Sequence, residues 1–520
     1  MVALGQSEGS VVSIFPHYLT RHGLIAGTTG TGKSRAMQLM AEQLADSGVS
    51  VFVSDVKGDA SGFCVSAPES AAASPIIERN KLAPFEPHAI KTNYWSISDR
   101  FARMRFSLDD SGSVLLSRLL SLNPTQESHL ALAFLYARKQ KKPLSDLNQL
   151  LDVLAEMRDN QERGVSPSSI SVIERKILSL EDSGLFELFG EPSVALDDLN
   201  GLNVLNLSDS RKDMIASIAP AFLINKLFNE LPEVGDVEIP KMIIFFDEAH
   251  YLFKDANKSL KDLMVTILKQ IRSKGVGVFF VTQDVSDLPE EILSQLSTKI
   301  IFSQKAATEK GNSRLKALAR SFPGSDPSLA ETLKALPPGE AILSSLDKSG
   351  NQTDAQRVVM FAPATSMAVV PDDMLLKATD PKLVERFGKA ERSKKSGSLI
   401  SKSIPSKPST ARTEPEPKRA KEAVAERVVE RVVEKKAAKK SGPSIWDGIF
   451  AFLLKLLDFV IKAVQKIAVA LIINPAKSLF RYLAKKPIRI LYLLIILIIL
   501  YAIFVNWPLI TSFLAKLKIS

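Results

Sequence analysis

Eight consecutive residues near the amino terminus have the types and the spacing that bind phosphate groups. Residues 27–34 read GTTGTGKS, which fits the pattern GxxxxGK[ST], and they lie between an apolar run and a stretch rich in Met, Leu, Ala and Gln. In such a strand-to-helix context, glycines let the backbone wrap round a phosphate, and the helix amino terminus offers free N–H groups and the positive end of a dipole. The alternative is a glycine- and threonine-rich turn that binds nothing.

The lysine and the serine of this motif have separate expected roles. Lys33 would reach the β- and γ-phosphates of ATP, and Ser34 would ligate Mg²⁺. The residues that we predict to bind ATP are Gly27, Thr28, Thr29, Gly30, Thr31, Gly32, Lys33 and Ser34.

A second candidate group follows a long apolar run. Residues 241–250 read KMIIFFDEAH, an expected buried strand that ends in Asp247 and Glu248. We expect Asp247 to hold the Mg²⁺ shell and Glu248 to polarise the attacking water as the catalytic base. Two solvent-facing acids at a strand end are the alternative. The letters DEAH also spell a helicase box, but we find no companion helicase motifs, so they carry little weight.

Two further strand ends carry polar residues. Gln283 follows the apolar run 276–282 and could sense the γ-phosphate and the attacking water, or it could be an ordinary strand-end glutamine. The segment 55–59 (DVKGD) follows an expected strand at 49–53. Because ligands bind at the carboxyl ends of parallel strands, we expect this segment beside the phosphate loop, although a plain polar turn is an equal alternative.

The elements that position these groups alternate along the chain. Apolar strands and helical stretches follow one another, which predicts an α/β fold: a three-layer sandwich around a mostly parallel sheet. From 112 to 190 apolar residues recur at i, i+3 and i+4, which predicts a helical insertion. Runs that begin at residues 340 and 357 predict a terminal hairpin. We therefore expect one ATPase domain over 1–372.

Charge is distributed unevenly along the 520 residues. The whole chain has 67 Lys and Arg against 57 Asp and Glu, and residues 375–520 contain 29 of the former and 11 of the latter. Residues 1–374 therefore have 38 against 46, a net charge of −8. The high pI gives no argument for nucleic-acid binding by the folded part, although a basic channel could still exist within an acidic domain. The single cysteine, Cys64, excludes an intramolecular disulfide.

The carboxyl-terminal part has three predicted sections. The composition of 373–443 predicts a disordered, basic, low-complexity linker, and 444–474 predicts an amphipathic helix. Residues 488–510 are apolar enough and long enough for a transmembrane helix, and a buried core helix is the alternative. Arg481, Lys485, Lys486 and Arg489 precede the charge-free part of this stretch, which begins at Ile490. The positive-inside rule then predicts an ATPase domain in the cytoplasm, tethered to the inner (cytoplasmic) membrane.

Taken together, five segments resemble a known family. They are HGLIAGTTGTGKS, VFVSDVKGDASG, LLSRLLSLNPTQES, IIFFDEAHYLF and IRSKGVGVFFVTQ. In this order they resemble the bacterial HerA-like C-terminal domain proteins, a branch of the HerA/FtsK division of P-loop ATPases, over about residues 5–370. The resemblance implies a RecA-like ATPase core that assembles as a ring, in the form of a homo-oligomeric hexamer, and moves double-stranded DNA through its centre.

The resemblance also implies roles for single residues. It assigns ATP and Mg²⁺ to Gly27, Gly32, Lys33 and Ser34, the two carboxylate roles to Asp247 and Glu248, and the sensor role to Gln283. Ring ATPases usually complete their site with an arginine from the neighbouring subunit, and Arg272 is the candidate. A helix-end arginine that binds carbonyl groups is the alternative for Arg272. Lys305 and Lys310 stand where the resemblance leads us to expect arginines.

The sequence leaves three hypotheses about function. The first is a membrane-anchored, Mg²⁺-dependent ring ATPase that moves along DNA as a translocase or a helicase-like protein. The second is an ATP-gated scaffold or signalling ATPase at the membrane, with no nucleic-acid substrate. The third is a nucleotide-binding protein that no longer hydrolyses ATP.

Overall fold

The computed structural model describes residues 1–388 except 69–84, 99, 163, 209–212, 255, 306–307, 325 and 327. Among these residues, no helix combines the length and the apolar character that crossing a bilayer requires. The predicted amphipathic helix (444–474), the predicted transmembrane helix (488–510) and the linker beyond 388 lie outside the described residues. The membrane tether therefore stays a prediction.

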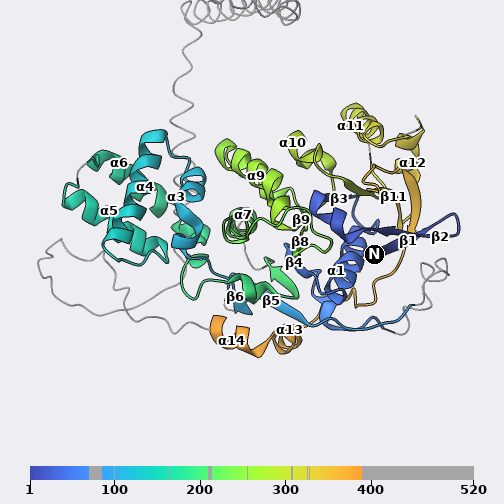
Figure 1. Cartoon of the computed structure of the whole chain (residues 1–520), viewed down its shortest axis with the longest axis horizontal. Helices are drawn as coiled ribbons and strands as arrows, with labels where there is room; N and C mark the ends of the chain where they lie inside the picture. Colours follow the sequence, from blue (N-terminus) through green and yellow to red (C-terminus); the bar gives the residue numbers. More distant parts are fainter. Residues whose placement is uncertain are drawn as a thin grey trace, which may run out of the picture. The chain divides into compact units, whose positions relative to one another are not determined.

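One large mixed sheet organises the described residues (Figure 1). Its strands are β1 (Val2–Ser7), β2 (Ser10–Ile14), β3 (Gly23–Ala26), β4 (Ser50–Asp55), β5 (Thr92–Ser96), β6 (Ala102–Arg103), β7 (Leu202–Asn206), β8 (Met242–Phe246), β9 (Val276–Thr282), β10 (Thr298–Ile301), β11 (Glu340–Ser344) and β12 (Gln356–Met360). Their spatial order is β2-β1-β12-β11-β10-β3-β9-β8-β4-β7-β5-β6. The strands from β10 to β6 in this order are parallel, and β2, β1, β12 and β11 add an antiparallel part. The predicted mostly parallel α/β sheet and the predicted terminal hairpin of β11 and β12 are confirmed.

Helices cover both faces of this sheet. They are α1 (Lys33–Asp46), α3 (Leu108–Leu119), α4 (Pro124–Lys139), α5 (Leu147–Asp159), α6 (Pro167–Leu178), α7 (Asp213–Glu230), α8 (Tyr251–Lys254), α9 (Lys258–Gln270), α10 (Glu290–Leu293), α11 (Glu309–Arg320), α12 (Leu329–Ala335), α13 (Asp372–Ala378) and α14 (Pro381–Phe387). One apolar core joins the sheet to α7, α9 and α11, and a second core joins its other face to α1. Every residue of β8 and of β9 is buried, as expected for parallel strands that are covered on both faces.

Helices α3–α6 occupy the stretch for which the sequence predicts a helical insertion at about 112–190. The first of them begins at Leu108, four residues earlier than predicted. The four helices form a group beside the sheet, and α3 packs against α7 and α9 (Figure 1). The insertion is therefore joined to the domain through the helices of one sheet face.

Two helices follow residue 372, where the sequence predicts that the ATPase domain ends. They are α13 and α14, and their apolar residues Leu375 and Phe387 are buried. The Phe387 ring packs edge-on against Trp95 of β5, with ring centroids 5.1 Å apart. The sequence analysis assigned these residues to the linker because charged residues surround their apolar positions. The packed part of the chain extends at least to residue 388.

A buried histidine fixes the strand that leads into the phosphate loop. His22 lies directly before β3; the Val278 N–H donates to its Nδ1 (3.0 Å), so its Nε2–H donates to the Leu268 carbonyl (2.8 Å). Burial lowers the pKa of His22 to about 4. The neutral ring therefore connects β3 to β9 and to α9.

Candidate nucleotide site

The phosphate loop connects β3 to α1 at the carboxyl edge of the parallel strands. The Gly27 N–H donates to the Thr282 carbonyl (3.2 Å), and the Thr28 N–H donates to the Ser303 carbonyl (2.9 Å). Helix α1 begins at Lys33, and its N-cap residue Gly32 has no side chain to cap the first turn. The N–H groups of that turn are therefore free to bind an anion, with the positive end of the helix dipole behind them.

Two glycines of the loop are required by its packing. A Cβ atom on Gly32 would lie 2.8 Å from the Phe302 ring, and this residue also has φ +127°. A Cβ atom on Gly27 would lie 2.6 Å from the Phe302 Cβ and 2.8 Å from the Thr31 hydroxyl. The loop therefore approaches the residue that follows β10 more closely than any side chain would permit.

Lys33 points back into the loop. Its side chain is buried, and its Nζ donates to the Thr28 carbonyl (3.2 Å). Burial lowers the pKa of Lys33, while the nearby Glu248 carboxylate opposes this change. Ser34 lies in the same first turn of α1 and is half-buried. Both side chains therefore lie in the first turn of α1, beside the phosphate loop.

The acid pair follows β8, two strands away from the phosphate loop. β9 pairs with β3 on one side, where Thr282 faces Ala26, and with β8 on the other, where Phe280 faces Phe246. The Asp247 N–H donates to the Ser54 carbonyl of β4 (3.1 Å), and both Asp247 and Glu248 are buried. Glu248 has φ +49°, a left-handed conformation that is uncommon for a glutamate and often marks functional positions.

A chain of hydrogen bonds joins the loop to the acid pair. The Thr29 hydroxyl donates to Gln283 Oε1 (3.0 Å), and Gln283 Nε2 donates to Glu248 Oε1 (2.7 Å). The loop, the residue after β9 and the acid after β8 thus meet at one edge of the sheet. The structure brings together the phosphate loop, the acid pair and Gln283, which the sequence analysis proposed as one site.

The polar segment after β4 also lies at this edge, and it contains a residue that the sequence analysis did not assign. The Asp55 carboxylate accepts the N–H groups of Lys57 (3.1 Å), Gly58 (2.8 Å) and Ala60 (2.8 Å), so it orders its own turn. The Lys57 ammonium forms an ion pair with Glu248 Oε1. The only sequence signal for this contact was the position of Lys57 in a polar run at the end of an expected parallel strand.

The charges of the site fit a bound cation and triphosphate. Burial raises the pKa of Asp247 to about 7, and the neighbouring Asp55 carboxylate adds to this effect. The Lys57 ammonium offsets this effect only in part, and a metal ion beside the carboxylate would supply further positive charge. Glu248 Oε2 is buried without a hydrogen-bond partner, although His250 Nδ1 lies 3.3 Å away. The donor set of Ser34 and Asp247 suits Mg²⁺, which prefers oxygen ligands.

Arg272 lies elsewhere. It belongs to the 3-10 turn Ile271–Lys274, which precedes β9, whereas Gln283 follows that strand. At about 3.3 Å per residue, the length of β9 separates the two by roughly 20 Å or more. Arg272 Nη2 donates to Asp236 Oδ1 (2.6 Å), and its side chain is 36% exposed. It takes no part in the site of its own chain, and its role in a neighbouring subunit stays a prediction.

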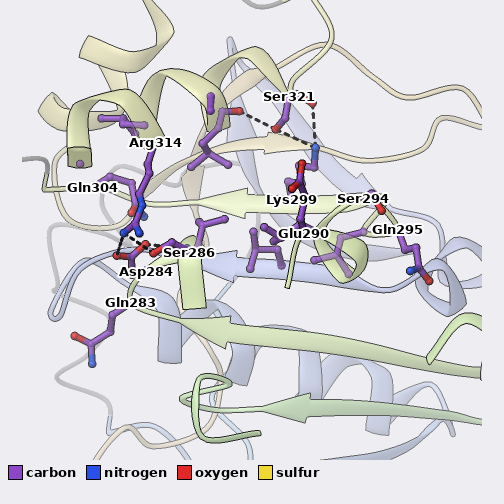
Figure 2. A pocket seen from close by; sticks show the side chains of 18 of the residues that line it. Gln283, Asp284, Ser286, Glu290, Ser294, Gln295, Lys299, Gln304, Arg314 and Ser321 are labelled. Atoms are coloured by element: carbon purple, nitrogen blue, oxygen red, sulfur yellow. Dashed lines mark hydrogen bonds and ion pairs between the residues drawn. The ribbon is translucent and has the colours of Figure 1, made fainter. Parts of the chain in front are cut away.

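A cavity of about 680 Å³ adjoins Gln283 on the α10 and α11 side of the sheet. Thr28 and Gln283 border it, and Figure 2 shows Arg314 of α11 directed toward Asp284 and Ser286, next to Gln283. Arg314 Nη1 donates to the Ser286 hydroxyl (2.8 Å) and lies 3.7 Å from Asp284 Oδ2. The segment after β9 is thus attached to α11 while its first residue contacts Glu248.

A glycine-rich phosphate loop and an acid pair at the same carboxyl edge of a mostly parallel sheet define a P-loop NTPase. Within this class, the chain belongs to the helicase HerA-like C-terminal family, which matches residues 3–453. The resemblance found in the sequence is therefore confirmed.

Similar proteins come from archaea and from a bacterium. The chain is 24% identical over 416 residues to the DNA double-strand break repair helicase HerA of Sulfurisphaera tokodaii. The matched part is 75% of this chain and 73% of the relative. It is 25% identical over 299 residues to the DNA import protein CedB of Sulfolobus acidocaldarius (56% of this chain, 45% of the relative). VirB4 of Thermoanaerobacter pseudethanolicus is a similar solved structure, with a TM-score of 0.46 and 15% identity over 69% of this chain and 96% of that one.

Proposed function

We propose that the chain is a Mg²⁺-dependent motor ATPase that hydrolyses ATP and moves along double-stranded DNA. The observation that carries the ATPase part is the hydrogen-bond chain from Thr29 through Gln283 to Glu248. It connects the group that would hold the phosphates to the group that would activate water. A binding loop alone would not need this connection.

Each residue of the site has a task in this proposal. Lys33 and the N–H groups of the loop bind the β- and γ-phosphates, and Ser34 and Asp247 hold Mg²⁺. When bound, Mg²⁺ neutralises charge that develops on the phosphate oxygens. Glu248 accepts a proton from the attacking water, and Gln283 orients that water relative to the loop.

The polymer and the assembly are proposed from the family. Relatives are named as a DNA repair helicase and a DNA import protein, which supports DNA as the track. We propose a homo-hexameric ring in which Arg272, on the far edge of the sheet, reaches the site of the next subunit. Its partly exposed side chain and its ion pair with the exposed Asp236 are compatible with this role.

We also propose that residues 488–510 tether the ring to the inner membrane, with the ATPase domain in the cytoplasm. The support is the length of the apolar run and the basic residues before it. Fractionation of cells that express the full chain, with and without residues 488–510, tests the tether. Recovery of both proteins in the soluble fraction would contradict it.

The test of the proposed function is ATP turnover by the full chain with and without double-stranded DNA, at a stated salt concentration. We expect turnover that requires Mg²⁺ and rises with DNA. Lys33→Ala should lose ATP binding, whereas Glu248→Gln should bind ATP and lose turnover. Turnover that ignores DNA would favour the membrane scaffold, and a Lys33→Ala protein with parental turnover would refute the ATPase site.

A further inference from the structure

The general base of the proposed reaction is held by two donors on the same oxygen. Glu248 Oε1 accepts Gln283 Nε2 and forms the ion pair with the Lys57 ammonium. The other oxygen, Oε2, is buried without a hydrogen-bond partner, and His250 Nδ1 lies 3.3 Å from it. The carboxylate is therefore unevenly engaged, with both of its hydrogen-bonding donors on Oε1.

Lys57 comes from a turn that is itself rigid. Asp55 is 1% exposed and accepts three backbone N–H groups of this turn, which places the Lys57 backbone at the edge of the sheet. β4 pairs with β8, where Ser54 faces Phe246, so the turn and the acid pair leave the sheet side by side. The Lys57 side chain is 38% exposed and Glu248 is 3% exposed. The lysine thus reaches a buried acid from the open side of the site.

Glu248 depends on such an anchor. Its φ of +49° gives the backbone an uncommon conformation, and its side chain is buried. Lys57 and Gln283 are the donors that reach its Oε1 from neighbouring strand ends. A buried carboxylate without these donors would lose its fixed direction.

We infer that Lys57 is a positioning residue of the ATPase site: it anchors Oε1 of Glu248 and so fixes the direction in which this carboxylate meets the attacking water. This inference rests on the proposed function, because it assigns a partner to the base of that reaction. Lys57 differs in this role from Lys33, which lies on the phosphate loop and donates to the Thr28 carbonyl. Lys57 acts through Glu248 and has no part in holding the triphosphate.

Replacement of Lys57 by methionine tests the role, because methionine keeps the length and removes the charge. In the full chain we expect Lys57→Met to lower kcat by about 10- to 100-fold, since general bases contribute on the order of 10²- to 10⁴-fold and only part of this is lost with the anchor. The Kd for ATP should stay within about 3-fold, because the loop is unchanged. Lys57→Arg should recover most of the rate. Lys91→Met is the matched control, because Lys91 pairs with Asp380 (3.4 Å) outside the site.

The same substitution in the Glu248→Gln variant distinguishes a lysine that positions Glu248 from a lysine that contacts the phosphates. In Glu248→Gln, single-turnover measurements should show that adding Lys57→Met changes the residual rate by less than about 2-fold, because the partner is already gone. An equal loss in both backgrounds, a loss in ATP affinity alone, or a Lys57→Met protein as fast as the parent would each overturn the inference. A parent without ATP turnover would instead refute the proposed function itself. Melting temperatures of all variants exclude a folding defect, and Lys57→Gln replaces Lys57→Met where the latter is unstable.

Discussion

Replacement of Gln283 by alanine should separate ATP binding from ATP turnover. The Gln283 amide accepts the Thr29 hydroxyl and donates to Glu248 Oε1, so alanine removes both contacts at once. Lys33 and the loop N–H groups remain, and Glu248 keeps its ion pair with Lys57. The variant therefore loses the connection between the loop and the base while each half stays in place.

The expected size of the effect follows from the lost contact with the base. A hydrogen bond to a charged group contributes about 1.5–3 kcal/mol, which corresponds to about 10- to 150-fold in rate when the bond acts in the transition state. The Kd for ATP should change by less than about 3-fold, since the contact with Thr29 is exposed and water replaces it. Steady-state turnover of the full chain and titration with a fluorescent ATP analogue measure the two quantities.

A matched variant shows which half of the connection matters. Thr29→Val removes only the exposed hydroxyl and should keep turnover within about 5-fold. If Gln283→Ala turned over ATP within about 3-fold of the parent, the chain of hydrogen bonds would have no catalytic role. The same conclusion would follow if ATP affinity fell in proportion to the rate.

Three further predictions concern the loop, the buried histidine and the domain boundary. Gly32→Ala should lower ATP affinity by about 10-fold or more, because its Cβ meets a ring, whereas Gly30→Ala meets no atom within 4 Å and should cost less; titration of both variants checks this. His22 has a pKa of about 4 in the fold, against 6.5 for an ordinary histidine, so the unfolded chain binds this proton first as pH falls. The free energy of unfolding should therefore be highest above pH 6.5 and be lower by about 2 kcal/mol at pH 5, as measured by denaturant titration; His22→Gln should remove this part of the pH dependence. Phe387→Ala should lower the free energy of unfolding by about 3 kcal/mol, because it loses the contact with Trp95. An unchanged free energy of unfolding would support a domain that ends at residue 372.

The sequence predicted the parts of the site that lie at strand ends. An apolar run followed by a polar residue marks the carboxyl end of a buried parallel strand, and Gln283 and Glu248 both have this signature. Parallel strands align their carboxyl ends, so the common edge could be inferred without the strand order. The order itself could not, because pairing between strands far apart in the chain has no local signal.

Contacts made by long side chains were beyond prediction for a related reason. Whether Lys57 reaches Glu248 depends on β4 being the neighbour of β8 and on the turn that Asp55 orders. The same holds for α14. Its buried Phe387 lies in a charged stretch whose composition predicts a linker, and only the contact with Trp95 shows that this stretch packs on the sheet. In both cases the partner comes from another part of the chain.

The strand order explains why a glutamine is needed between the loop and the base. β9 separates β3 from β8, so the phosphate loop and Glu248 are two strands apart, about 9–10 Å in the direction across the sheet. This gap is too wide for a direct hydrogen bond between the loop and the carboxylate. The residue that follows β9 lies midway, and its amide accepts from one neighbour and donates to the other. In the proposed reaction, a change in the position of Thr29 on phosphate binding would therefore reach Glu248 through Gln283, which would make this residue a point of control over hydrolysis.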